Sequence, residues 1–359
     1  MRIKAIALLQ ELTEAHSISG FEDEVRSIFI DELQEVGPLD TDKSGSVICA
    51  HTNEGPRVII AGHMDEVGFM VQNITPDGFI QFVTIGGWWN QVMLGQRVQI
   101  LNRDGEKIPG LIGSKPVHFL SPSQRDSPVP VESMFIDIGA NSRREVVDTY
   151  RIQLGAPIAP LSAFTPMANP NLFMAKAFDN RVGMAATIQS AQILAEMDHP
   201  NELFFAGTVQ EEVGLRGAKT LAHFTKPDVA IILEGPPADD TPGFNLSESQ
   251  GKLGSGVQIR LFDPTAIANP RLAELAIETA ELANIPYQVT VRRGGGTDAG
   301  SFHLANSGIP SIVLGVPTRY IHSHNAIIDI NDYLAMLNLT VALANELNQS
   351  RVDELTRYL

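Results

Sequence analysis

The chain has 359 residues, of which 43% are hydrophobic and 19% are charged, a composition typical of a folded globular protein with room for two domains. Its formal net charge of −16 repels phosphate backbones and anionic lipids, which argues against nucleic acid and membrane surfaces as partners. Cys49 is the only cysteine, which excludes an internal disulfide and a zinc site built from several thiolates.

The amino-terminal segment does not have the pattern of a targeting signal. Polar residues interrupt residues 1–11 too early for the apolar core of a signal peptide, and no later run is long enough to cross a bilayer. We therefore expect a cytoplasmic protein.

Residues 1–36 are predicted to form two amphipathic helices. Ile3, Ile6, Leu9 and Leu12 are spaced along one helical face, and the pair Ser19-Gly20 interrupts the pattern before the second helix begins. Two strands are expected next, at 47–50 and 57–62. The second strand ends directly before the sequence His63-Met64-Asp65-Glu66.

Residues 67–164 differ from the rest of the chain in their pattern of apolar and turn-forming residues. Short apolar runs such as 79–83 and 97–101 are separated by turn signals, among them Pro76-Asp77-Gly78, and no helix longer than two turns is evident. This pattern predicts an inserted β-rich domain, folded as a small barrel or sandwich. Its segment 121–130, rich in Ser and Pro, is predicted to be a flexible surface loop.

The alternation of strands and helices resumes after residue 164, which predicts a layered α/β domain. That domain is discontinuous, comprising residues 1–66 and 165–359, with residues 67–164 inserted. The elements expected in its second part are helices at 181–197, 270–283 and 332–347 and strands at 202–209, 228–233, 256–261, 287–291 and 311–314.

Two adjacent carboxylates, Glu211 and Glu212, follow the continuously apolar strand 202–209. They would lie at its carboxyl end, where open α/β sheets bind their ligands. Neighbouring side chains on an extended backbone point in opposite directions, so one acid is suited to a metal and the other to a proton. The alternative is a solvated loop that carries two acids.

Other candidate metal ligands fall at the same edge of the predicted sheet. His63 follows one strand, Glu234 follows another, and His322 follows the strand 311–314 after a short loop, while Asp179 stands just before a helix. Imidazole and carboxylate groups gathered from separate elements are typical of a metal site.

Each of these residues also has a structural interpretation. Asp179 is placed to cap the helix that follows it. His63 is equally explained as a core histidine bonded to Asp65, or as a ligand whose second ring nitrogen Asp65 orients. Glu234 would otherwise be a strand-ending acid, and both His322 and His324 are explained as loop histidines.

The glycine run 294–296 lacks the Lys-Ser/Thr ending of a P-loop and the spacing of a dinucleotide fingerprint. It is predicted to be a turn into a helix capped by Thr297 or Asp298. Arg292 and Arg293, beside this run, either favour acidic substrates or are solvated surface arginines.

Taken together, these stretches resemble the M42 family of metallo-aminopeptidases, the glutamyl and deblocking type, whose members assemble as tetrahedral dodecamers. The resemblance spans nearly the whole chain. The motifs that carry it are Gly62-His63-Met64-Asp65-Glu66-Val67-Gly68, Ala177-Phe178-Asp179-Asn180-Arg181, Gln210-Glu211-Glu212-Val213-Gly214, Gly295-Gly296-Thr297-Asp298-Ala299 and Arg319-Tyr320-Ile321-His322-Ser323.

The resemblance implies a mixed-sheet, three-layer α/β metallopeptidase domain with an inserted barrel-like domain that mediates dimerisation. It also implies two divalent ions per subunit, zinc or cobalt, bridged by Asp179. His63 and Glu234 would complete one metal site, and Glu212 and His322 the other.

The catalytic residues implied by the resemblance are Glu211 as general base and Asp65 as the group that orients His63. A water shared by the two cations would be the nucleophile, and the substrates would be peptides admitted to the cavity of a homo-oligomer. The chain departs from the family pattern at Glu234, where Asp is usual, and at His324, where many members have Pro.

Three other functions are compatible with parts of this pattern. A related carboxypeptidase or deacylase can use similar ligands. A glycosidase would need Glu211 and Glu212 to face each other across a sugar, which adjacent residues on one strand do not readily do. A non-catalytic assembly protein would hold its metal in a closed tetrahedral site.

Overall fold

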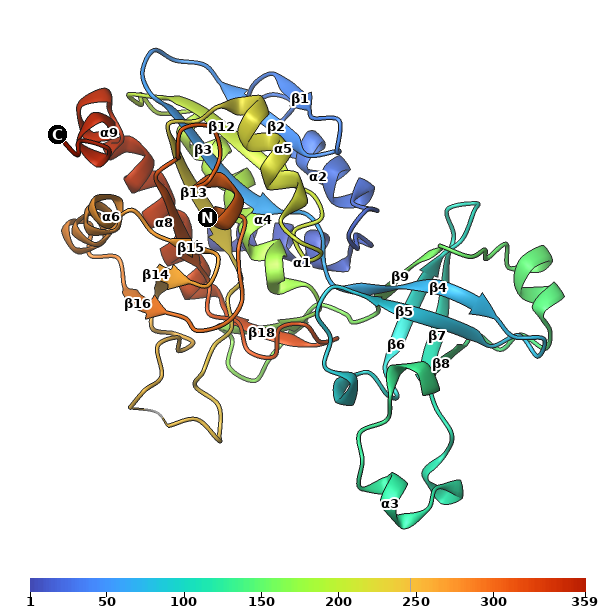
Figure 1. The fold of residues 1–359 in the computed structure, drawn as a ribbon. Helices are drawn as coiled ribbons and strands as arrows, with labels where there is room; N and C mark the ends of the chain where they lie inside the picture. Colours follow the sequence, from blue (N-terminus) through green and yellow to red (C-terminus); the bar gives the residue numbers. More distant parts are fainter. Residues whose placement is uncertain (246) are drawn as a thin grey trace.

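A computed structural model describes residues 1–245 and 247–359. It consists of a layered α/β part, which contains both ends of the chain, and a closed six-stranded barrel that stands to one side of it (Figure 1). The α/β class, the mixed sheet and the inserted barrel agree with the fold expected from the sequence.

A nine-stranded mixed sheet forms the middle layer of the α/β part. Its strands lie in the order β1-β2-β12-β3-β13-β17-β14-β15, and β16 pairs with β14. The central strands β12, β3, β13 and β17 are mutually parallel, whereas β2 and β14 run antiparallel to them. The bounds are β1 Leu39–Thr41, β2 Val47–His51, β3 Arg57–His63, β12 Glu202–Thr208, β13 Val229–Glu234, β14 Val257–Asp263, β15 Ala266–Ile267, β16 Tyr287–Val291 and β17 Ser311–Gly315.

Helices cover both faces of this sheet, which makes three layers. They are α1 Arg2–Glu14, α2 Asp23–Leu33, α4 Phe178–Leu194, α5 Arg216–Thr225, α6 Pro270–Leu282, α7 Ala299–Phe302, α8 Ile330–Glu346 and α9 Gln349–Leu355. The central strands are apolar at nearly every position because alternate residues face opposite layers. In β3, Val58 and Ile60 pack with α1, α4 and α8, whereas Ile59 packs with α5 and α7.

The barrel has its own hydrophobic core, in which Phe69, Ile100 and Ile136 are fully buried. Its strands close in the order β4-β5-β8-β7-β6-β9. They are β4 Gly68–Ile74, β5 Ile80–Ile85, β6 Arg97–Leu101, β7 Lys107–Gly113, β8 Phe135–Asp137 and β9 Pro157–Pro160, and a loop carrying the short helix α3 Pro122–Arg125 projects from them (Figure 1). Residues 121–130, predicted to be entirely loop, therefore contain one helical turn, which begins with a capping box at Ser121.

A buried ionic cluster, which we call the junction cluster and define as Glu66, Lys176 and Arg181, holds the segment that leads into the barrel against the α/β part. Glu66 precedes β4, and its Oε1 accepts from Lys176 Nζ at 2.6 Å and from Arg181 Nη2 at 3.1 Å. Lys176 follows β11 (Leu172–Ala175), which forms a small sheet with β10 (Thr165–Pro166) and β18 (Ala326–Asp329). Removing one partner from such a buried cluster typically costs about 3–5 kcal/mol.

Some elements differ from the sequence prediction. The range of α4 starts at Phe178, but Asp179 and Asn180 have non-helical backbone angles, so the regular helix begins at Arg181, as expected. Helix α7 follows the glycine run, as expected, whereas α5, α9 and the small sheet of β10, β11 and β18 were not predicted. In the part of the chain that the structure describes, no helix is long and apolar enough to span a membrane.

Candidate active site

The predicted ligands converge at the carboxyl edge of the large sheet. His63 ends β3, Glu234 ends β13, and β12 pairs with β3 so that Thr208 lies opposite His63, which places Glu211 and Glu212 just beyond the same edge. The first turn of α4 supplies Asp179, and the loop after β17 supplies His322. All six side chains line one cavity of about 620 Å³.

Asp179 lies between the two histidines. Its Oδ1 is 3.3 Å from His63 Nε2 and its Oδ2 is 3.4 Å from His322 Nε2. Around His63, Glu234 Oε2 lies at 3.6 Å and Glu211 Oε2 at 3.9 Å from Nε2. Around His322, Glu212 Oε2 lies 3.2 Å from Nε2. The six predicted residues therefore form two adjoining groups that share Asp179.

These separations fit ligands of a common ion better than hydrogen bonds. Charge-assisted N–H···O⁻ bonds are about 2.7–2.9 Å long. Two atoms bound about 2.1 Å from one ion in a tetrahedral arrangement lie about 3.4 Å apart. The distances of 3.2–3.6 Å from the two imidazoles to Asp179, Glu212 and Glu234 match the second value.

Two carboxylates of the cavity have an oxygen atom without a hydrogen-bond partner among the described residues. Glu212 Oε1 and Glu234 Oε1 are buried and have no hydrogen-bond partner among the described residues. Buried polar atoms normally have such a partner, and buried charges are normally paired or bind metal ions. Ligand atoms within 4.8 Å of one another can be drawn from His63, Glu211 and Glu234, and again from His63, Asp179 and Glu212. The residues present therefore fit divalent cations.

The crowding of charged groups in the cavity also shifts the pKa values of its carboxylates and of His322. The pKa of Glu234 is raised to about 8, mainly by burial and further by the neighbouring carboxylates of Asp179 and Asp298, against the opposing influence of His63. Burial also raises the pKa of Glu211 well above its usual range. The pKa of His322 is raised to about 11 because Asp179 and Glu212 outweigh the effect of burial. A bound cation would relieve this repulsion by favouring the ionised carboxylates.

His63 is held in one tautomer by its own loop. The ring is 1% exposed, and its Nδ1 lies 3.0 Å from the backbone carbonyl oxygen of Asp65 and 3.4 Å from Asp65 Oδ1. A proton on Nδ1 leaves Nε2, the atom that faces Asp179, free to bind a metal. The shorter contact to the ring is made by the Asp65 backbone rather than by the carboxylate that was expected to make it.

The carboxylate of Asp65 instead holds the backbone of the two glutamates. Oδ1 accepts from the Glu211 N–H at 3.0 Å, and Oδ2 accepts from the Glu212 N–H at 3.1 Å and from the Ser19 hydroxyl at 2.6 Å. Ser19, which the sequence indicated only as a helix break, thus supports the site from the amino-terminal layer.

The structural interpretations of three other residues are also resolved. Asp179 has non-helical backbone angles and does not cap the helix that follows, because the Gly183 N–H donates instead to Asn180 Oδ1 at 3.0 Å. Asp298 occupies the cap position of α7 without capping it, and its carboxylate accepts instead from the hydroxyl of Thr208. His324 lies outside the ligand group and packs beside Trp88, with ring centroids 5.5 Å apart.

Arg260 is a cavity residue that the sequence analysis missed. It is 6% exposed, it lines the same cavity as His63, and its Nη1 donates to Asp263 at 3.2 Å, while its Nε has no partner among the described residues. The signal available in the sequence was a charge between the apolar residues Ile259 and Leu261 of β14. Arg292, considered earlier, forms an ion pair with Asp239 at 2.6 Å and does not line the cavity.

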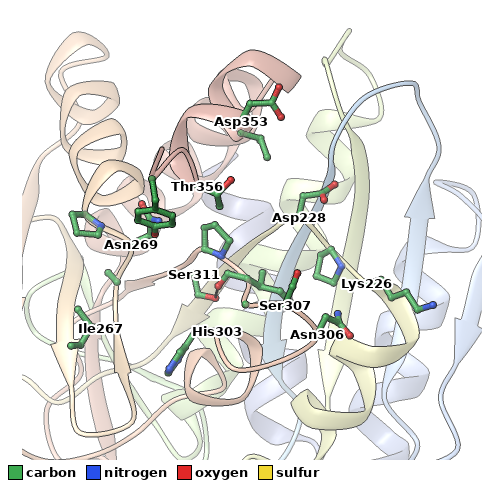
Figure 2. Close-up of a pocket in the computed structure, with 18 of the residues that line it drawn as sticks. Lys226, Asp228, Ile267, Asn269, His303, Asn306, Ser307, Ser311, Asp353 and Thr356 are labelled. Atoms are coloured by element: carbon green, nitrogen blue, oxygen red, sulfur yellow. Dashed lines mark hydrogen bonds between the residues drawn. The ribbon is translucent and has the colours of Figure 1, made fainter.

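A larger hollow, of about 970 Å³, lies at the opposite edge of the sheet, where β13 and β17 begin (Figure 2). Its polar side chains, among them Asn269, His303 and Asp353, are spread around a wide rim instead of converging on one point. It contains none of the predicted ligands, so size alone does not identify the active site.

Comparison with known proteins identifies the family. The model of the M42 glutamyl aminopeptidase family matches residues 45–339. The putative aminopeptidase FrvX of Escherichia coli is 41% identical and the glutamyl aminopeptidase of Lactococcus lactis is 37% identical, each over 98% of both chains.

Solved structures agree with this assignment. The TET aminopeptidase of Thaumarchaeota archaeon SCGC AB-539-E09 superimposes with a TM-score of 0.95 at 40% identity, covering 99% of this chain and 100% of that one. The TET1 peptidase of Pyrococcus horikoshii superimposes with a TM-score of 0.85 at 31% identity, covering 96% of this chain and 100% of that one. That peptidase is described as assembling into a tetrahedron or a large octahedral shell. The chain therefore belongs to the M42 family of metal-dependent aminopeptidases.

Proposed function

We propose that the protein is a dinuclear aminopeptidase that removes single residues from the amino termini of peptides. The observation that carries the proposal is the position of Asp179, whose two carboxylate oxygens face His63 on one side and His322 on the other. His63 and Glu234 would hold one ion with Asp179, and Glu212 and His322 would hold the second. Zinc and cobalt are the ions that we expect.

Bound divalent ions supply a water of lowered pKa and polarise the scissile carbonyl. Glu211 supplies the proton transfer. Its carboxylate lies 3.9 Å from His63 Nε2, farther than those of Asp179 and Glu234, and its raised pKa suits a group that accepts a proton and returns it to the departing amine. The Asp65 carboxylate, bonded to the backbone of Glu211 and Glu212, positions both side chains.

The cavity also suggests which residue is removed. Its carboxylates suit the free ammonium group of a peptide, and Arg260 on its wall suits an acidic side chain, because a guanidinium binds a carboxylate through charge-assisted hydrogen bonds. The name of the 37% identical Lactococcus relative agrees with this preference. We therefore propose amino-terminal Glu and Asp as the favoured substrates.

Metal removal tests the proposed reaction. Treatment with a chelator is expected to abolish hydrolysis of glutamyl and leucyl chromogenic amides, and added Zn²⁺ or Co²⁺ is expected to restore it. Acetylation of the substrate amine should prevent hydrolysis even in the metal-loaded protein. If none of the aminoacyl amides is cleaved after metal is restored, the proposal that the protein is an aminopeptidase is rejected. Cleavage of the acetylated substrates would indicate a deacylase instead.

Arg260→Met tests the substrate preference. Loss of the guanidinium is expected to lower the ratio of kcat/KM for glutamyl over glutaminyl amides by about 100-fold, because the substrate carboxylate would be left without its partner. Arg292→Met is the matched control, since that side chain pairs with Asp239 away from the cavity. An unchanged ratio in Arg260→Met would exclude Arg260 as the selecting group.

Assembly and location follow as further proposals. We propose that the protein forms homo-oligomers in which residues 67–164 act as a dimerisation domain and dimers build a tetrahedral dodecamer. The barrel and its loops expose Leu111, Val117 and Phe119, apolar side chains that a partner subunit would cover. The cytoplasmic location expected from the sequence stays a prediction.

A further inference from the structure

A second hollow, of about 720 Å³, adjoins the catalytic cavity on the side of the barrel. One wall comes from the barrel loop between β5 and β6, with Trp88 and Trp89, and the other comes from the loop after β17, with Tyr320 and His324. Gly87, Ile321 and His322 line both this hollow and the catalytic cavity. The two spaces therefore meet at these residues. We call the second space the aromatic hollow.

The aromatic hollow differs in chemistry from the catalytic cavity. None of the described residues that line it carries a carboxylate, and its walls are formed mainly by aromatic and aliphatic side chains. Trp89 is 62% exposed and Tyr320 is 55% exposed, so two large rings present uncovered surface in a concave place beside the reactive groups. Concave sites lined by aromatic rings are typical binding places for apolar ligand groups.

One wall of the aromatic hollow is fixed before any ligand arrives. Trp88 donates from Nε1 to the Gly68 carbonyl oxygen at 3.0 Å, and its ring stacks on Phe69 with centroids 4.5 Å apart. His324, which is 1% exposed, also packs against the Trp88 ring, with centroids 5.5 Å apart. A wall held in this way binds a side chain with little loss of conformational freedom.

We propose that the aromatic hollow receives the side chain of the residue that follows the scissile bond, and that it selects peptides in which this residue is aromatic or large and aliphatic. This inference rests on the proposed aminopeptidase function. The ammonium group and the first side chain of the substrate are drawn to the carboxylates and to Arg260, inside the catalytic cavity. The leaving part of the peptide then passes His322 on the side away from Arg260, where the aromatic hollow begins.

The inference gives the barrel a second role. The loop that carries Trp88 and Trp89 lies between two barrel strands, yet Gly87 approaches the His322 ring so closely that a Cβ at this position would lie 3.4 Å from Nδ1. The inserted part of the chain therefore supplies a wall for the substrate as well as the surface proposed for dimerisation.

A series of tripeptides Glu-Xaa-Gly, with Phe, Leu, Gly or Lys as the second residue, tests the proposal in the metal-loaded protein. We expect kcat/KM for Glu-Phe-Gly to exceed that for Glu-Gly-Gly by about 10-fold or more, mainly through KM, because an aromatic side chain leaves water for the hollow. Trp89→Ala is expected to reduce this ratio to about 2 or less, and Trp89→Phe to retain most of it.

Tyr358→Ala is the matched control, because Tyr358 is 77% exposed and lines the hollow at the opposite edge of the sheet. It should keep the wild-type ratio. Equal kcat/KM for the Phe and Gly peptides, or a parallel loss for all four peptides in Trp89→Ala, would overturn the inference while leaving the aminopeptidase intact. Absence of metal-restored hydrolysis of every peptide would reject both the proposed function and the inference.

Discussion

Replacing Glu211 by glutamine is expected to lower kcat by about three orders of magnitude, equivalent to about 4 kcal/mol of transition-state stabilisation, while the two proposed metal ions remain bound. Glutamine has nearly the same shape as glutamate, but its amide cannot accept a proton near neutral pH. The Glu211 backbone N–H would still donate to Asp65, so the segment should keep its position. Steady-state kinetics and metal analysis of the same preparation provide the two measurements.

Two outcomes would contradict the role of Glu211 as general base. Substantial turnover by Glu211→Gln with its full metal content would show that another group moves the proton. Loss of an ion would show that Glu211 is a ligand, which is conceivable because its Oε2 lies within 3.9 Å of His63 Nε2. Glu278→Gln, at an exposed position of α6, serves as the control for the loss of a single surface charge.

Asp179→Asn is expected to remove both metal ions and to lower activity by more than 1,000-fold. Asparagine keeps the shape of aspartate but replaces one carboxylate oxygen by an NH₂ group, which cannot bind a cation. Because Oδ1 faces His63 and Oδ2 faces His322, a single substitution damages both sites. Metal content per chain, measured by elemental analysis after gel filtration, is the primary readout.

Glu234→Gln tests whether a residue that is proposed to bind only one ion differs from Asp179, which is proposed to bind both. Glu234 lies beside His63 alone, so this variant should lose one ion per chain and retain the other. Thermal unfolding of both variants would show whether metal loss follows from a local change or from loss of the fold. Two ions retained by Asp179→Asn would rule out the bridging arrangement.

The strands of the large sheet were predictable because strands buried on both faces must be apolar at nearly every position. β3, β12 and β13 appear in the sequence as uninterrupted apolar runs, and the polar residues that end them mark the carboxyl edge of the sheet. The approach of His63, Glu211, Glu212 and Glu234 follows from that topology. Prediction of the α/β fold and of a clustered site therefore rested on the same physical signal.

Features that depend on distant partners were not predictable from local patterns. β11 pairs with β18, about 150 residues away in the chain, so neither segment alone indicates the small sheet. Asp298 occupies a helix cap position, and only the position of Thr208 on β12 shows that its carboxylate is used elsewhere. Arg260 was visible as one charge in an apolar strand, but the cavity that it lines is assembled from several loops.

The junction cluster has a consequence for how any assembled particle would work. Glu66, which stands directly before the barrel, binds Lys176 and Arg181, and Arg181 also donates to the backbone carbonyl oxygen of Met64, next to His63. The chain is thus held at the catalytic edge directly before it enters the barrel. If subunits associate through their barrels, this anchored entry point is one restraint on the direction that each active site faces, toward the interior of the shell or toward its outside.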